Sequence, residues 1–535
     1  MDLLEKTVGD FGKWQLRISI CMALLKFPIA WFQLGIVFLA PPTDHWCRQP
    51  EDFKLLTVED WIEHIRPYGN ETNYDDTKVK CLMRNVELPH VRELMPCKWG
   101  YDYDKSVIHS SIITEFNLVC GKESLVDVTQ MTLMLGVLFG NIIFGVMADR
   151  IGRKKTLIAS IIMQSACGML SAWSPWLELF LVLRFLMAVA NGGTMVTSFV
   201  MCMEVVGGIW RIIVPILYQI PFGIGNTLMA GLAYYLRDWR ELQLALSVFS
   251  GFFIVYIWLI PESPRWLIAT GKRKEAAVIL EKAAKHNGMD EREVKKAFLA
   301  VPETKQEERA KFSSVLKTPN LRKRTLLLCV NWLICGVTFY GFTQYLGQIG
   351  SNIYFTVAVG GLITIPGTMM CVFIIKRYGR KWTIASSYFF ISLCFLGILL
   401  IPTGRFVHDW PRISFAGLGI IGLSIATPAL YLFTGELFPT VLRNAGVGGT
   451  VMWMRLGSMA SPFVISLKTY SAHLPLIILA SLTLLQSILI LPLPESSALL
   501  PDTVKDIEMS EIVNNNDILN GNYLSVPIKV PEEDE

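Results

Sequence analysis

Charged residues are scarce in this sequence. Only 18% of its 535 residues are Asp, Glu, Lys or Arg, and 52% are hydrophobic, whereas soluble domains carry roughly 25% charged residues. The hydrophobic residues are gathered in about twelve runs, each close to the roughly 20 residues that cross a lipid bilayer. This pattern excludes an ordinary soluble domain and predicts a multi-pass protein embedded in the lipid bilayer.

The sequence also lacks the motifs of nucleotide and metal chemistry. It contains no Walker phosphate-binding loop and no Cys/His cluster with metal-ligand spacing. We therefore expect no cofactor, no metal and no nucleic-acid partner, and neither an enzyme nor an ATP-driven pump. Residues 1–13 have no signal-peptide cleavage site, so the first hydrophobic run, about residues 16–40, is expected to remain as a membrane helix.

Three short patterns occur twice, and each second copy lies about 230 residues after the first. The charged loop at 149–155, which separates two hydrophobic runs, recurs at 376–381. The other two repeats are Glu204…Arg211 with Glu436…Arg443, and Pro261-Glu262-Ser263 with Pro494-Glu495-Ser496. Chance repetition of short strings is the alternative. Their shared separation predicts two homologous halves that face each other in the membrane.

Residues 41–124 form a long hydrophilic segment between the first two hydrophobic runs. The segment contains the glycosylation sequon Asn70-Glu71-Thr72. It also contains four cysteines, which allow two disulfides in three pairings; they are Cys47, Cys81, Cys97 and Cys120. An even cysteine set beside a sequon is typical of an oxidising environment, so we expect an extracellular, disulfide-bearing, glycosylated loop.

The short loops at 149–155 and 376–381 are rich in Lys and Arg, which the positive-inside rule places in the cytoplasm together with both termini. The resulting plan is all-helical, with twelve transmembrane helices. Its parts are a six-helix half at 1–260, a cytoplasmic linker at 261–324 with an amphipathic helix at 272–300, a second six-helix half at 325–493, and an acidic, disordered tail at 494–535.

Several of these motifs resemble a known family. The loop Gly145…Asp149-Arg150-Ile151-Gly152-Arg153-Lys154 is similar to the signature between spans two and three of major facilitator transporters. More narrowly, the chain resembles the organic cation/anion/carnitine transporters, solute carrier family 22, over about residues 10–497. The matching segments are 111–120, 238–243, 261–267 and 435–444, and segments 26–28 and 38–42 look most like insect members.

The resemblance implies a major facilitator fold of two pseudo-symmetric six-helix halves with a cavity between them. It also implies transport of small organic ions across the plasma membrane by alternating access, either facilitative or secondary-active, with a coupling ion or exchange anion left open as a partner. Two alternatives stay open. One is an organic cation transporter, and the other is a membrane receptor or sensor that has kept the fold and lost transport.

Charged residues inside spans are costly and are candidates for function; here they are Lys26, Arg184, Glu204 and Arg455. Arg184 matches the family's span-four arginine, which implies a role near the cavity or its coupling network, with a structural arginine as the alternative. Lys26 adds a second possible positive charge, and its alternative is snorkelling to the interface. Glu204 is interpreted as a gate residue or as a solvated residue at the end of its span.

Arg455 is the main candidate for binding substrate. The resemblance implies arginine here in carriers of organic anions and carnitine, and aspartate in the cation carriers. A guanidinium can hold a carboxylate through two parallel hydrogen bonds. Anion exchangers of the family also tend to have a basic residue in span eight, two positions after a proline, where this chain has Thr368. This departure favours monocarboxylates and zwitterions as substrates.

Aromatic residues are further candidates, because a ring face can attract an ammonium group. Packing is the alternative for each of them. Tyr340 is favoured by the family's similar Tyr-Gly pair, and Trp453 is a further candidate. For the gate, we expect charged residues of the repeated motifs to pair when the cytoplasmic side is closed; these are Asp149, Arg150, Arg153, Glu204, Arg211, Arg380, Glu436 and Arg443.

Overall fold

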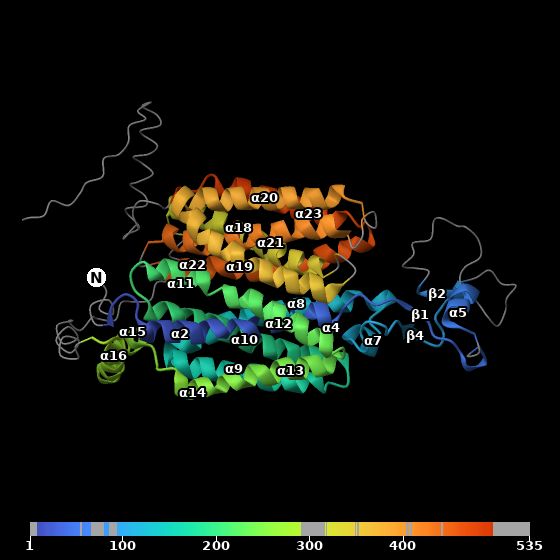
Figure 1. The fold of residues 1–535 in the computed structure, drawn as a ribbon, viewed down its shortest axis with the longest axis horizontal. Coiled ribbons are helices and arrows are strands. Elements are labelled where there is room, and N and C mark those ends of the chain that lie inside the picture. The colour runs from blue at the N-terminus through green and yellow to red at the C-terminus, as the bar shows by residue number, and fades with distance from the viewer. Residues whose placement is uncertain are drawn as a thin grey trace, which may run out of the picture.

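Hydrophobic runs separated by charged loops fold as a bundle of long, roughly parallel helices in the computed structural model (Figure 1). The structure describes residues 8–53, 56–65, 80–84, 94–289, 316, 318–347, 349, 352–402, 406, 409–439 and 442–495. The end of the bundle with the charged loops at 149–155 and 376–381 is called the loop end. The end with the segment at 41–123 is called the disulfide end.

The first half contains six spanning segments, of which the first, fifth and sixth are interrupted. Pro221 marks the break in the fifth span, because proline has no N–H and cannot continue the helix that precedes it. The segments are α2 (Lys13–Leu24), α3 (Lys26–Leu34) and α4 (Ile36–Leu39); α8 (Ser124–Ile151); α9 (Arg153–Ala172); α10 (Leu177–Val205); α11 (Trp210–Leu217) and α12 (Ile220–Tyr235); and α13 (Trp239–Phe252), η3 (Phe253–Val255) and α14 (Tyr256–Leu259).

The second half repeats this order with longer, mostly uninterrupted helices. They are α18 (Pro319–Leu346), α19 (Ile353–Tyr378), α20 (Arg380–Leu400), α21 (Trp410–Leu437), α22 (Arg443–Ser466) followed by η6 (Leu467–Thr469), and α23 (Leu474–Ile490). Among the described residues, ten helical segments are long and apolar enough to cross a membrane. The Gly- and Ser-rich α22 and the short α23 complete the twelve predicted spans.

The two halves meet mainly along two pairs of helices, α8 with α22 and α12 with α19. Within the second half, α18 packs closely along α22 at Gly336, where an added Cβ would lie 2.0 Å from the carbonyl oxygen of Met454. A larger residue at this position would push the two helices apart. The absence of a side chain at Gly336 therefore lets α22 approach α18 closely, and this places Arg455, the residue after Met454, beside α18.

The segment at the disulfide end has two small antiparallel sheets (Figure 1). Its elements are β1 (His45–Cys47) paired with β4 (Tyr101–Tyr103), β2 (Leu82–Arg84) paired with β3 (Leu94–Pro96), the helices α5 (Val58–Ile65) and α7 (Ile112–Phe116), and the turns η1 (Glu51–Phe53) and η2 (Cys120–Lys122). Of the three possible pairings, the structure has the disulfides Cys47–Cys97 and Cys81–Cys120. The sequon residue Asn70 lies outside the described residues.

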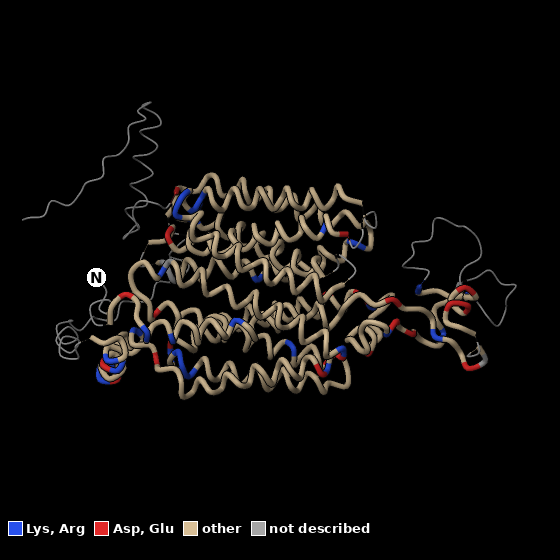
Figure 2. Tube along the Cα trace, viewed as in Figure 1, with Lys and Arg blue, Asp and Glu red and all other residues tan. Residues whose placement is uncertain are grey.

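At the loop end, α15 (Pro264–Ala269) and α16 (Arg273–Asn287) lie beside the start of the chain (Figure 1). Asn287 ties them together, because its side-chain oxygen accepts a hydrogen bond from the backbone N–H of Trp14 at 3.0 Å. The predicted amphipathic helix at 272–300 is therefore present over its first half, and residues 290–300 and 496–535 lie outside the described part. Figure 2 shows that charged residues gather at the two ends of the bundle, with few along its length.

Candidate functional site

A cavity of about 140 Å³ lies between the two halves. Side chains from α3 and α12 line it on one side, and side chains from α18, α19, α21 and α22 line it on the other. Its charged lining residues are Lys26 and Arg455, and none of the described residues that line it is Asp or Glu. The other polar and aromatic lining residues are Gln33, Gln219, Phe222, Asn226, Phe339, Tyr340, Phe342, Thr343, Thr364, Thr368, Ser424, Thr427 and Tyr431.

Arg455 is almost fully buried, with 3% of its surface exposed. Its Nη1 donates a hydrogen bond to the hydroxyl of Tyr340 at 2.6 Å, and its Nη2 lies 3.1 Å from the sulfur of Met195. Its Nε has no hydrogen-bond partner, and no carboxylate of the described residues pairs with it. A buried guanidinium whose contacts are a neutral oxygen and a sulfur retains the capacity to bind an anion.

Lys26 lies in the cavity wall of the first half. Its Nζ is 4.5 Å from the centre of the Tyr218 ring, a cation–π contact, and the Tyr218 hydroxyl shares a 2.6 Å hydrogen bond with Ser198. The alternative of snorkelling to the membrane interface does not fit this position. Like Arg455, Lys26 has no carboxylate partner among the residues that the structure describes.

The structure brings Tyr340 and Thr368 to the cavity together with these two cations, but it places two other predicted residues elsewhere. Arg184 is buried behind the cavity wall, where its Nη2 donates to the side-chain oxygen of Gln130 at 3.3 Å. Trp453, contrary to expectation, is not among the lining residues and is 38% exposed. It is two residues from Arg455, and at about 100° per residue it faces another side of α22.

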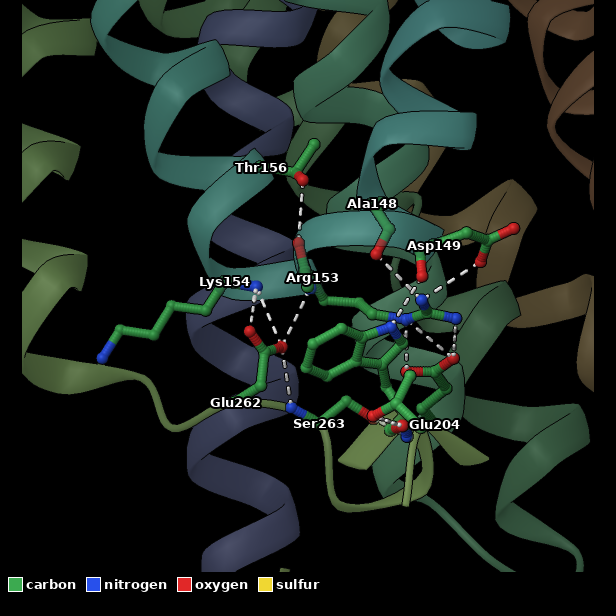
Figure 3. Close-up of polar contacts among 11 residues, drawn as sticks. Ala148, Asp149, Arg153, Lys154, Thr156, Glu204, Glu262 and Ser263 are labelled. Atoms are coloured by element: carbon green, nitrogen blue, oxygen red, sulfur yellow. Dashed lines mark hydrogen bonds and ion pairs between the residues drawn. The ribbon is translucent and has the colours of Figure 1, made fainter. Parts of the chain in front are cut away.

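A second cluster lies at the loop end, around Arg153 (Figure 3). The Arg153 guanidinium lies between two carboxylates, 2.8 Å from Glu204 and 3.1 Å from Asp149. The carboxylate of Glu262 accepts hydrogen bonds from the backbone N–H groups of Arg153 at 2.9 Å and Lys154 at 3.0 Å. These are the first N–H groups of α9, which have no partner within the helix, so Glu262 caps the helix and opposes its dipole.

The second half contains the same arrangement. Arg380 pairs with Glu436 at 3.0 Å, and Glu495 accepts from the first backbone N–H of α20, that of Arg380, at 2.8 Å. Gly152 and Gly379 precede the two helices with φ values of +112° and +80°, a conformation that residues with a side chain rarely adopt. The three repeated sequence patterns therefore fold into two equivalent clusters of one arginine and two glutamates.

The remaining predicted gate residues are less well defined. Glu204 is 17% exposed at its side chain and is paired, so the interpretation of it as a solvated span end does not hold. Arg150 is exposed, and the Nε of Arg211 donates to the carbonyl of Val206 at 3.3 Å. The side chain of Arg443 lies outside the described residues. Glu262 and Glu495 were not among the predicted gate residues, although their repeated Pro-Glu-Ser motif was a signal for them.

Comparison with known proteins places the chain in a family. Residues 112–510 match the Major Facilitator Superfamily. An organic cation transporter protein of Drosophila melanogaster is 32% identical over 514 residues, covering 94% of this chain and 93% of that protein. Solute carrier family 22 member 3 of Rattus norvegicus is 32% identical over 532 residues, covering 95% of each, and member 13 of Homo sapiens is 31% identical over 547 residues, covering 99% and 95%. The chain belongs to solute carrier family 22 of the major facilitator superfamily.

Solved structures support the fold of this family 22 member. The inward-open conformation of the xylose transporter XylE from E. coli matches 93% of this chain and 99% of that one, with a TM-score of 0.64 at 13% identity. A partially occluded inward-open conformation of the same transporter has a TM-score of 0.61 at 12% identity. At such low identity the likeness shows the fold alone, and it confirms the predicted architecture of twelve helices in two halves.

Family membership also decides the broad class of activity. The chain is a multi-pass membrane transporter, and the relatives above are named transporters or solute carriers. The alternative of a non-transporting receptor receives no support from them. The two clusters at the loop end and the cavity between the halves are thus features of a transporter.

Proposed function

We propose that this family 22 member carries small organic anions or zwitterions by alternating access, and that Arg455 binds their carboxylate. The observation that carries the proposal is a cavity lined by two cations and, among its described lining residues, by no acid. A desolvated charge is costly unless it is paired, and the contacts of Arg455 are neutral. A substrate carboxylate supplies the missing charge through hydrogen bonds to the guanidinium.

Transport of organic cations is the second candidate, and it is favoured by the name of the Drosophila relative, an organic cation transporter. The aromatic lining residues also suit an ammonium group; they are Phe222, Phe339, Tyr340, Phe342 and Tyr431. Lys26 and Arg455 argue against it, because they repel a cation in the same low-dielectric space. Thr368 contributes a hydroxyl with no charge, so the cavity wall offers a cation no opposite charge at this position either.

The proposed setting is the plasma membrane, with halves at 1–260 and 325–493, the disulfide end outside and both termini in the cytoplasm. The basic short loops support this orientation. A tag near Asn70 should be reached by antibody on intact cells, and Asn70→Gln should remove a glycan mass shift. A tag near Lys285 should be reached only after permeabilisation. The opposite pattern would reverse the orientation and the assignment of the gate.

The substrate proposal is tested by uptake into cells that express the full chain. The probes are radiolabelled carnitine, β-alanine, glutarate and tetraethylammonium. Loss of one partner from a buried charge pair costs a few kcal/mol, so Arg455→Ala should weaken uptake of acids roughly tenfold or more. Arg455→Lys should recover only part of it, because an ammonium lacks the planar fork.

Arg322→Ala is the matched control, because this arginine is exposed in the first turn of α18. It should leave uptake unchanged at equal surface expression. Unchanged acid uptake in Arg455→Ala would contradict the proposal, as would a wild-type preference for tetraethylammonium over every acid. Preloading cells with the transported acid tests the mode of transport, since faster uptake into preloaded cells indicates exchange.

A further inference from the structure

Gln33 joins the two halves of the transporter at the wall of the cavity. It lies on α3 and is 1% exposed. Its side-chain oxygen accepts a hydrogen bond from the Tyr340 hydroxyl at 2.6 Å, across 307 residues of sequence, and its amide nitrogen donates to Asn191 at 2.9 Å. The hydroxyl that donates to Gln33 is the one that accepts from Arg455 at 2.6 Å. Gln33 is therefore one hydrogen bond away from the group that contacts Arg455.

The hydrogen bonds continue beyond Gln33 into the first half. The Asn191 amide donates to the oxygen of Gln164 at 3.2 Å, and the Gln164 amide donates to the hydroxyl of Ser250 at 2.9 Å. Every donor in this series points the same way, from Arg455 at one end to Ser250 at the other. Hydrogen bonds aligned in this manner polarise one another, and a cation at the donor end strengthens the whole series.

A second buried arginine, Arg184, is linked to the backbone carbonyl of Gln33. Arg184 donates to the side-chain oxygen of Gln130 at 3.3 Å, and the Gln130 amide donates to the backbone carbonyl of Gln33 at 3.1 Å. The Arg455 series passes through the side chain of Gln33, and the Arg184 series ends on its main-chain carbonyl. Contacts within the first half therefore fix the position of Gln33 independently of its contact with Tyr340.

The direction of the Tyr340 hydroxyl follows from its partner. A hydroxyl has one proton, and an amide oxygen can only accept, so Tyr340 must donate to Gln33. Its lone pairs then face Arg455, which can only donate. Without an acceptor at position 33 the hydroxyl proton would be free to turn, and Arg455 would lose a fixed oxygen partner. Gln33 therefore determines how Tyr340 holds the guanidinium.

We infer that Gln33 is a positioning residue of the anion site and couples its occupancy to the contact between the halves. The inference rests on the proposed role of Arg455. A bound acid accepts from guanidinium N–H groups that have no partner among the described residues, such as Nε, while Nη1 stays on the Tyr340 hydroxyl. The Tyr340–Gln33 hydrogen bond is the step where this series crosses between the halves, so the contact that positions Arg455 for the acid is also a contact between the halves. Loss of this hydrogen bond therefore misplaces the guanidinium and weakens acid binding.

A double-mutant cycle on KM tests this coupling. The probe is whichever of carnitine, β-alanine and glutarate the wild-type full chain takes up fastest. Gln33→Met keeps the length of the side chain without the acceptor, and Tyr340→Phe removes the hydroxyl. Each should raise KM about threefold to tenfold. Both substitutions break the same hydrogen bond, between Tyr340 and Gln33. The KM of the double variant should therefore stay within about twofold of the KM of the more impaired single variant. A KM that rises by the product of the two effects would overturn the inference.

The control for the cycle is Asn226→Leu, another buried amide in the cavity wall, whose side-chain oxygen has no hydrogen-bond partner among the described residues. Its effect should multiply with that of Tyr340→Phe, because it lies outside the series. Gln33→Glu is the second variant. It keeps the acceptor and adds a carboxylate one hydrogen bond from Arg455, so acid KM should rise more than tenfold and tetraethylammonium uptake should appear. A purely structural Gln33 would lower surface expression without changing this selectivity, and that result would also overturn the inference.

Arg455→Ala separates this inference from the proposed function. Suppose that Arg455→Ala abolishes acid uptake, but the KM effects of Gln33→Met and Tyr340→Phe multiply in the double variant. The anion site is then supported, and the coupling through Gln33 is wrong. If Arg455→Ala leaves acid uptake unchanged, the proposed function fails first. Unchanged KM in Gln33→Met, with acid uptake still dependent on Arg455, would contradict only the positioning role.

Discussion

The guanidinium of Arg153 lies 2.8 Å from the carboxylate of Glu204, and this pair has a counterpart at 3.0 Å between Arg380 and Glu436 in the second half. The two pairs differ in the number of contacts that each arginine makes. Arg153 has a second carboxylate partner in Asp149, whereas Arg380 has no other carboxylate partner for its side chain among the described residues. The equivalent pairs are therefore not equally protected against the loss of their glutamate.

This difference predicts unequal effects of the same substitution. Glu436→Gln leaves Arg380 without a carboxylate, and removing one member of a largely buried pair is destabilising. Glu204→Gln leaves Arg153 paired with Asp149. We expect maximal uptake per transporter at the cell surface to fall about fivefold in Glu436→Gln and about twofold in Glu204→Gln, by the order of magnitude of such pairs. Equal effects would show that Asp149 does not compensate.

Glu262 provides a separate prediction on stability. Its carboxylate caps the first N–H groups of α9, so Glu262→Ala should lower the free energy of unfolding by about 1 to 2 kcal/mol. Glu262→Gln should cost less, because the amide oxygen still accepts but carries no charge. Glu275→Ala, at an exposed position on α16, is the control. Thermal unfolding of the detergent-solubilised protein, followed by tryptophan fluorescence, measures the difference. A midpoint for Glu262→Ala equal to that of the control would contradict the capping role.

The repeated motifs show how much of this transporter could be predicted from its sequence. A shared separation along the chain was enough to predict two homologous halves, and the structure places Arg153 and Arg380 in equivalent clusters. The hydrophobic runs and the placement of Lys26 and Arg455 within them were also sufficient to nominate both cations. Membrane burial makes such residues conspicuous, because a charge inside a span is rare.

Other features depend on three-dimensional proximity that no local pattern reports. In the sequence, Gln33 is a single polar residue within a hydrophobic run. Its contact with Tyr340 joins residues that are 307 positions apart. Four cysteines allow three pairings, and only the packing of the strands selects one. Trp453 was nominated as an aromatic residue that could hold an ammonium group, but the rotation of α22 decides which residues face the cavity. The predicted pairing of Arg443 in the gate stays a prediction, since its side chain lies outside the described residues.

The disulfide pairing leads to a third prediction. Cys47 and Cys97 close a loop of 50 residues, and loss of a native disulfide from a small secreted domain typically costs about 2 to 5 kcal/mol. Cys47→Ser and Cys97→Ser should therefore reduce surface expression to the same extent. The double variant should be no worse than either one, because both remove the same bond. Non-reducing peptide mapping should recover Cys47 linked to Cys97, and a Cys47–Cys81 peptide would contradict the pairing.

The last prediction concerns the charge of Lys26, which faces the same cavity as Arg455 from the opposite half. Two cations in one cavity favour an acid with two carboxylates over one with a single carboxylate, provided that both side chains contribute. Lys26→Met should therefore raise the KM for glutarate about tenfold, and the KM for β-alanine should change less, because its ammonium gains nothing from Lys26. Lys26→Glu places an acid opposite Arg455 and should favour β-alanine and carnitine over glutarate. Lys122→Met, exposed at the disulfide end, is the control and should change neither KM. Equal shifts for glutarate and β-alanine in Lys26→Met would show that Lys26 shapes the cavity without selecting charge, and Arg455 would then be the sole determinant of anion binding.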